Sequence, residues 1–187
     1  NVVLQDDQEH LHRLSINLYE TGSLSDDSRL RPNPYRTPGY PAFAGAVYYI
    51  SGNNPWVVLF LQILLDSLTA VLIAQIMLLF VTPAVAFWVT LLYVFDPAPV
   101  IYTSKLLSDP LYVFICTAAL HRLAHFLKSN PVQIGLLMQS ALLWGLSCYV
   151  RPLSQYIPLI IIIVLIIRFR KDYKSWIKYA AVFTLLF

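Results

Sequence analysis

Charged residues are scarce in this chain of 187 residues: only 12% are Asp, Glu, Lys or Arg, whereas 58% are hydrophobic. So small a polar fraction cannot cover the surface of a soluble globule, which excludes an ordinary soluble domain. The formal net charge is only +3, and we do not expect the cations to gather on one face. The composition therefore predicts a protein whose solvent is lipid, and it gives no indication of a nucleic-acid partner.

Cysteine and catalytic motifs of soluble enzymes are equally scarce. Cys116 and Cys148 both lie inside apolar runs, which favours small packing residues over a disulfide or a metal pair. No glycine-rich phosphate loop and no Ser/His/Asp arrangement is visible, so nucleotide-sugar or ATP chemistry has no support. His121 and His125 share a helical face, but no third ligand is near them in the sequence. We therefore expect no metal site at these histidines.

Long apolar runs separated by short polar segments fill the chain from residue 55 to residue 187. A helix needs about 20 mainly apolar residues to cross a bilayer. The run 55–95 is about twice that length, and we divide it near Thr82-Pro83 into two helices. Asp96-Pro97 should stop the second of them, and a loop should follow as far as Asp109. Further spans are predicted at 111–127, 134–150 and 153–167.

Residues 1–54 differ from the rest, because they are mostly polar with amphipathic stretches. A helix with apolar positions at Leu11, Leu14 and Leu18 is predicted to end at Gly22. The apolar stretch 40–50 has about half the length of a span, so we expect a juxtamembrane helix there. The sequence thus predicts an all-α membrane protein with an outer loop with juxtamembrane helices over 1–54 and a multi-spanning helical bundle over 55–187. Because the chain begins at Asn and stops partway through an apolar run, we expect it to be a piece of a longer protein.

The positive-inside rule orients this bundle. The densest basic segment, residues 168–178, is assigned to the cytoplasm. Counting spans backwards places Arg151, the 96–109 loop and the N-terminal loop on the outer face, provided that 40–50 does not cross. If that stretch does cross, the acidic N-terminal loop and Asp109 lie on opposite faces.

The charged residues of that outer face are the candidates for chemistry. Carboxylates can take a proton from an acceptor hydroxyl, and cations can stabilise a departing phosphate. The alternative is that these side chains only anchor the protein at the membrane interface by snorkelling. The residues concerned are Asp6, Asp7, Arg36, Lys105, Asp109 and Arg151.

Several short motifs follow one another along the chain: Asp7-Gln8 with residues 12–18, residues 35–41 with Phe43, Gln62 with Leu65-Asp66 and Thr69, residues 107–111, and Gly145-Leu146 with Arg151-Pro152. In this order they resemble motifs of the GT-C membrane glycosyltransferases, in the branch of the protein O-mannosyltransferases and the lipid A aminoarabinose transferases. The resemblance covers nearly the whole chain. The motif at 107–111 departs from the family, because Asp109 stands where Glu is usual.

The resemblance implies an inverting glycosyltransferase that uses a sugar linked to polyprenyl phosphate. In this family the reaction takes place at the outer leaflet, which implies a multi-pass protein of the bacterial plasma membrane. The acceptor would be a lipid, a glycan or a protein, and Asp7 or Asp6 would take its proton. The family's tyrosine four residues after the acid is replaced by Leu11 or His10. The spacing to Asn17-Leu18 favours Asp7 and leaves Asp6 open.

The resemblance also implies roles for the other charged positions. Arg36, Lys105 and Arg151 are the candidates for holding the lipid phosphate, with arginine preferred for bidentate contact, and Tyr40 joins them as a substrate-binding candidate. Asp109 is open to two roles, orienting the acceptor or binding a divalent cation. The rival functions are a transporter or flippase of a lipid-linked or anionic substrate, which would use the same charges, and a non-catalytic membrane scaffold.

Overall fold

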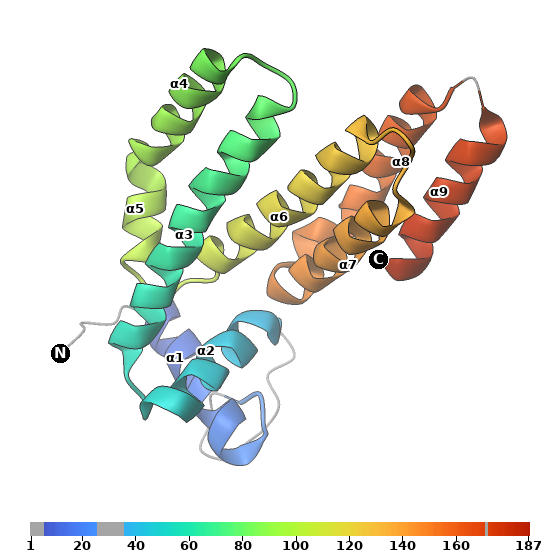
Figure 1. Cartoon of the computed structure of the whole chain (residues 1–187). Helices are drawn as coiled ribbons and strands as arrows, with labels where there is room; N and C mark the ends of the chain where they lie inside the picture. The colour runs from blue at the N-terminus through green and yellow to red at the C-terminus, as the bar shows by residue number, and fades with distance from the viewer. Residues whose placement is uncertain (1–5, 26–35, 171) are drawn as a thin grey trace. The chain divides into compact units, whose positions relative to one another are not determined.

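The computed structural model describes residues 6–25, 36–170 and 172–187. All regular secondary structure in this part of the chain is helical, which confirms the predicted all-α class. Figure 1 shows the helices in chain order. Their bounds are α1 Asp6–Thr21, α2 Gly39–Ser51, α3 Pro55–Leu78, α4 Pro83–Val94, α5 Pro97–Thr103, α6 Asp109–Lys128, α7 Ile134–Val150, a 3-10 turn Pro152–Tyr156, α8 Ile157–Arg168 and α9 Tyr173–Leu186.

Helices α3 and α6 are each long and apolar enough to cross a membrane. Helices α4 and α5 together would make a third span, broken by a bend of 48°. Helix α7 and the segment Pro152–Arg168 are apolar but shorter. These helices confirm a membrane protein, because exposed apolar surface on this scale needs lipid as its solvent.

The breaks between helices follow proline and acidic caps. Pro83 begins α4, so the predicted division of the run 55–95 is confirmed. The prediction of an uninterrupted loop from Asp96 to Asp109 is wrong, because α5 lies within it. The Asp96 carboxylate accepts a hydrogen bond of 2.9 Å from the Ala98 amide, and Pro97 occupies the first turn. An N-cap residue followed by proline ends the preceding helix and also starts a new one.

The chain divides into two compact units, and each contains parts distant in sequence. Unit 1 consists of Asn1–Leu68, Phe95–Phe114 and Tyr149–Arg151, and unit 2 consists of Thr69–Val94, Ile115–Cys148 and Pro152–Phe187.

In unit 1, α1 packs alongside α2 (Figure 1). Leu14 and Tyr48 are buried between these helices, and Nδ1 of His12 lies 2.7 Å from the Tyr48 hydroxyl. Burial lowers the pKa of His12, which favours the neutral imidazole at pH 7. Helix α1 ends before Gly22, whose φ of 71° confirms the predicted stop. The contact fixes α1, and with it the acidic start of the helix, against α2.

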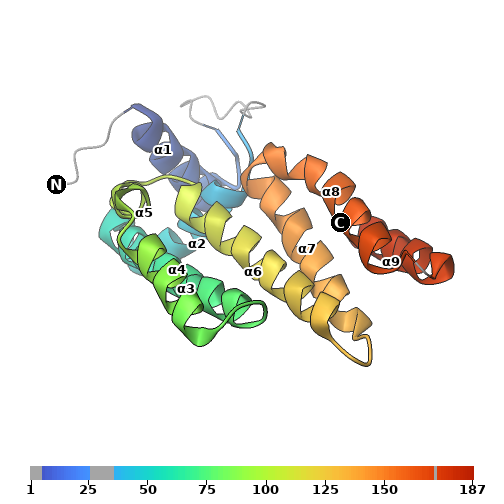
Figure 2. The same ribbon diagram turned by 90° about the horizontal axis from the view of Figure 1, so that it is seen from above.

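In unit 2, the later part of α6 is followed by α7, α8 and α9 in that order across the view of Figure 2. Their core contains Phe126, Leu137 and Phe183, all fully buried. The Ser140 hydroxyl donates a hydrogen bond of 2.9 Å to the Ala119 carbonyl, so small residues bring α6 and α7 close together.

Candidate active site

The described candidate residues all belong to unit 1, although they come from segments distant in sequence. For Asp6 only the backbone, at the start of α1, is described, so its side chain lies outside the described part of the structure. The others are Asp7, Arg36, Tyr40, Lys105, Asp109 and Arg151.

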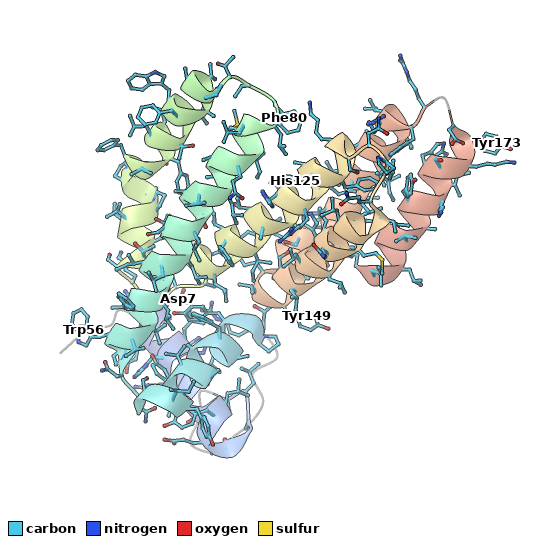
Figure 3. All side chains as sticks on the ribbon, in the orientation of Figure 1. Asp7, Trp56, Phe80, His125, Tyr149 and Tyr173 are labelled. Atoms are coloured by element: carbon cyan, nitrogen blue, oxygen red, sulfur yellow. The ribbon has the colours of Figure 1, made fainter. Side chains whose placement is uncertain are left out.

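Asp7 and Arg36 form an ion pair between segments 29 residues apart. Asp7 lies in the first turn of α1 (Figure 3), where the helix dipole favours a negative charge. Arg36 immediately precedes the turn that starts α2. The side chains are 54% and 38% exposed, respectively. Both groups therefore remain accessible to a ligand.

Asp109 and Arg151 form a second ion pair, with 2.5 Å between the arginine Nη2 and the carboxylate Oδ2. Nε of Arg151 also donates to the Ser108 hydroxyl at 3.2 Å, and its guanidinium lies 5.6 Å from the Tyr112 ring centroid. Arg151 is thus held on three sides, whereas the only side-chain partner found for Arg36 in the described residues is Asp7. Arg36 has the more available donors.

A close backbone contact joins the segments that carry the two arginines. The Thr37 hydroxyl donates a hydrogen bond of 2.8 Å to the Val150 carbonyl. A Cβ atom on Gly39 would lie 2.6 Å from the Tyr149 carbonyl oxygen, so only glycine permits this approach. Arg36 precedes this contact on one segment, and Arg151 follows it on the other. The two ion pairs therefore belong to segments that touch.

Gln62 connects Tyr40 with Lys105 inside unit 1. Its Oε1 accepts a hydrogen bond of 3.0 Å from the Tyr40 hydroxyl, and its Nε2 donates a hydrogen bond of 2.9 Å to the Lys105 carbonyl. Gln62 is fully buried and Tyr40 is 2% exposed, so both side chains lie beneath the surface. No partner is found for the Lys105 ammonium among the described residues.

Sequence reasoning had noted Gln62 only as part of a motif and had not assigned it this bridging role. Its signal was an amide within a mainly apolar helix, because a buried amide must find hydrogen-bond partners. Thr37 and Ser108 also stand in motifs of the sequence, and nothing there indicates their hydrogen-bond partners.

No group of three or more His, Cys, Asp or Glu side chains gathers in the described residues. The partner of Asp109 there is a cation, Arg151. The rings of His121 and His125 lie 4.5 Å apart, centroid to centroid. A divalent cation at Asp109 stays a prediction, without a second carboxylate in the described residues to support it.

The sequence model of the dolichyl-phosphate-mannose-protein mannosyltransferases matches residues 34–187. The matched region contains Arg36, Tyr40, Lys105, Asp109 and Arg151 and leaves out the acidic start of α1. Searches among curated proteins and among solved structures found no match.

Proposed function

The chain belongs to the dolichyl-phosphate-mannose-protein mannosyltransferase family, and we propose that it transfers a sugar from a polyprenyl-phosphate donor to an acceptor hydroxyl on a lipid, glycan or protein. The family makes it a membrane glycosyltransferase of the mannosyltransferase type. The observation that supports the donor is the ion pair of Asp7 and Arg36, because a carboxylate can take a proton and a guanidinium can bind a phosphate.

In the proposed reaction the acceptor oxygen attacks the anomeric carbon and forms the new glycosidic bond. The bond from that carbon to the phosphate oxygen breaks, and polyprenyl phosphate leaves with the electron pair, which inverts the anomeric configuration. The acceptor's proton passes to the Asp7 carboxylate, with Asp6 as the alternative base. Asp7 is half exposed, so an acceptor can reach it without unfolding α1.

Arg36 and Lys105 are the proposed contacts of the lipid phosphate. The guanidinium of Arg36 offers donors beyond those that bind Asp7, and the Lys105 ammonium has no partner in the described residues. Arg151, held by Asp109 and Ser108, would contribute charge from a fixed position. We assign Tyr40 a positioning role, because its buried hydroxyl reaches Gln62 and through it the Lys105 backbone.

Two rival functions remain. One is transport of an intact lipid-linked or anionic substrate, and the other is that of a non-catalytic membrane scaffold. The test uses the full-length protein in proteoliposomes with a radiolabelled polyprenyl-phosphate sugar and candidate acceptors. We expect labelled acceptor together with free polyprenyl phosphate. Movement of uncleaved donor across the bilayer would establish the transporter instead. If the protein neither binds nor cleaves the donor, the scaffold is favoured.

We also propose that unit 1 carries its charges on the outer face of a bacterial plasma membrane. Helix α2 has 13 residues and is about 20 Å long, which is short of the bilayer's hydrocarbon core of about 30 Å. The start of α1 and the loop before α6 should then share one face.

Cysteine labelling checks this orientation in a background without Cys116 and Cys148. Exposed positions suit the test: Thr21→Cys at the end of α1 and Ser104→Cys after α5. We expect an impermeant maleimide to label both in intact cells, whereas Lys174→Cys should react only after permeabilisation. Labelling of Thr21→Cys and Ser104→Cys from opposite sides would mean that α2 crosses the membrane.

A further inference from the structure

A cavity of about 530 Å³ in unit 2 shares no residue with the candidate active site. It opens where α6 and α8 end and where α3 passes into α4. Four of its lining side chains are apolar and two are cationic: Phe80, Leu127, Val164 and Ile167, with Lys128 and Arg168. Figure 3 labels Phe80, beyond the end of α3.

The two cations border the cavity without being neutralised. Nζ of Lys128 lies 4.7 Å from the Phe80 ring centroid. Nε of Arg168 donates a hydrogen bond of 3.2 Å to the Leu127 carbonyl. No carboxylate in the described part of the chain pairs with either side chain. The ammonium of Lys128 and the terminal guanidinium nitrogens of Arg168 therefore remain free to bind an anion.

The apolar wall of the cavity faces outward as well. Phe80 is 53% exposed and Ile167 is 66% exposed, which in a membrane protein means contact with lipid. Lys128 and Arg168 are the last residues of α6 and α8, and the basic segment of the chain follows Arg168. The positive-inside rule puts these helix ends at the cytoplasmic surface, where the acyl region meets the head groups.

We propose that this cavity binds an anionic glycerophospholipid of the cytoplasmic leaflet. Its phosphate would lie between Lys128 and Arg168, and one acyl chain would run along Phe80, Val164 and Ile167. Basic pockets between membrane helices on the cytoplasmic side suit such head groups. A free phosphate would leave the apolar wall unused, and a zwitterionic lipid would bring a cation of its own close to Lys128 and Arg168. The proposal does not depend on sugar transfer.

The test compares charge removal inside and outside the cavity in the full-length purified protein. Phosphatidylglycerol is titrated into delipidated protein in a neutral detergent, and bound lipid is counted by native mass spectrometry. We expect the double variant Lys128→Gln/Arg168→Gln to bind about tenfold more weakly or worse. The matched control Lys174→Gln/Lys178→Gln removes the same charge from exposed positions on α9 and should bind as the wild type does.

A cavity-filling variant separates a shaped site from general attraction between charges. Val164→Trp keeps both cations and should abolish tight binding of phosphatidylglycerol. The thermal unfolding midpoint checks that this variant folds correctly. Equal binding of phosphatidylcholine, or equal weakening by the cavity and control variants, would overturn the proposal. Displacement of the lipid by millimolar inorganic phosphate would overturn it too, because the site would then serve a soluble anion. If the tryptophan variant does not fold, the charge variants still decide.

Discussion

Replacing Asp7 with Asn should lower the rate of sugar transfer about 100-fold or more while leaving donor binding largely intact. Asparagine keeps the shape of the side chain and can still accept a hydrogen bond, but it cannot take the acceptor's proton. The substitution also breaks the ion pair with Arg36, which frees that guanidinium for the donor phosphate. The loss should therefore appear in kcat. The measurement is single-turnover transfer from a radiolabelled polyprenyl-phosphate sugar, alongside the donor's dissociation constant.

Glu9→Gln is the matched control for this substitution. Glu9 lies on the same helix and is also paired with an arginine, Arg13, through side chains that are 48% and 61% exposed. Its replacement should leave transfer near the wild-type rate. Asp6→Asn should have a milder effect than Asp7→Asn if the spacing to Asn17-Leu18 gives the right register. Transfer at the wild-type rate in both aspartate variants would show that the base does not come from the start of α1.

The helices could be predicted from the sequence where a local signal marked their ends. Gly22 after α1 and Pro83 at the start of α4 were such signals, because each acts through its own backbone geometry. Helix α5 was missed because Asp96-Pro97 has two meanings: the same pair ends one helix and caps the next. Only the apolar character of the residues that followed, 98–103, pointed to the second meaning, and too few residues were involved to show a period.

The charged residues of the site could be predicted, but their pairing could not. Asp7 pairs with Arg36 across 29 positions of the sequence, and Asp109 pairs with Arg151 across 42. Contacts of this kind depend on tertiary packing between segments far apart in the chain, which composition and spacing do not encode. The predicted topology supplied the list of charged residues, the family resemblance implied their roles, and the structure supplied the partners.

Arg36→Ala should weaken donor binding about 10- to 150-fold, which corresponds to about 1.5 to 3 kcal/mol for a lost charge-assisted hydrogen bond. Arg36 has a single carboxylate partner in the described residues and is 38% exposed, so its remaining donors can reach a lipid phosphate. Arg36→Lys should be clearly impaired as well, since an ammonium cannot hold Asp7 and the phosphate through one planar fork. The measurement is equilibrium binding of the radiolabelled donor to full-length protein in detergent.

Arg13→Ala is the control, because Arg13 forms an exposed ion pair with Glu9 on α1, as Arg36 does with Asp7. Its loss should leave the donor's dissociation constant unchanged, which separates a phosphate contact from a general loss of positive charge. Unchanged donor binding in Arg36→Ala would remove Arg36 from the phosphate site and shift that role to Lys105 or Arg151. Together with the kcat effect of Asp7→Asn, the two substitutions should divide one ion pair into a residue that binds the donor and a residue that takes the proton.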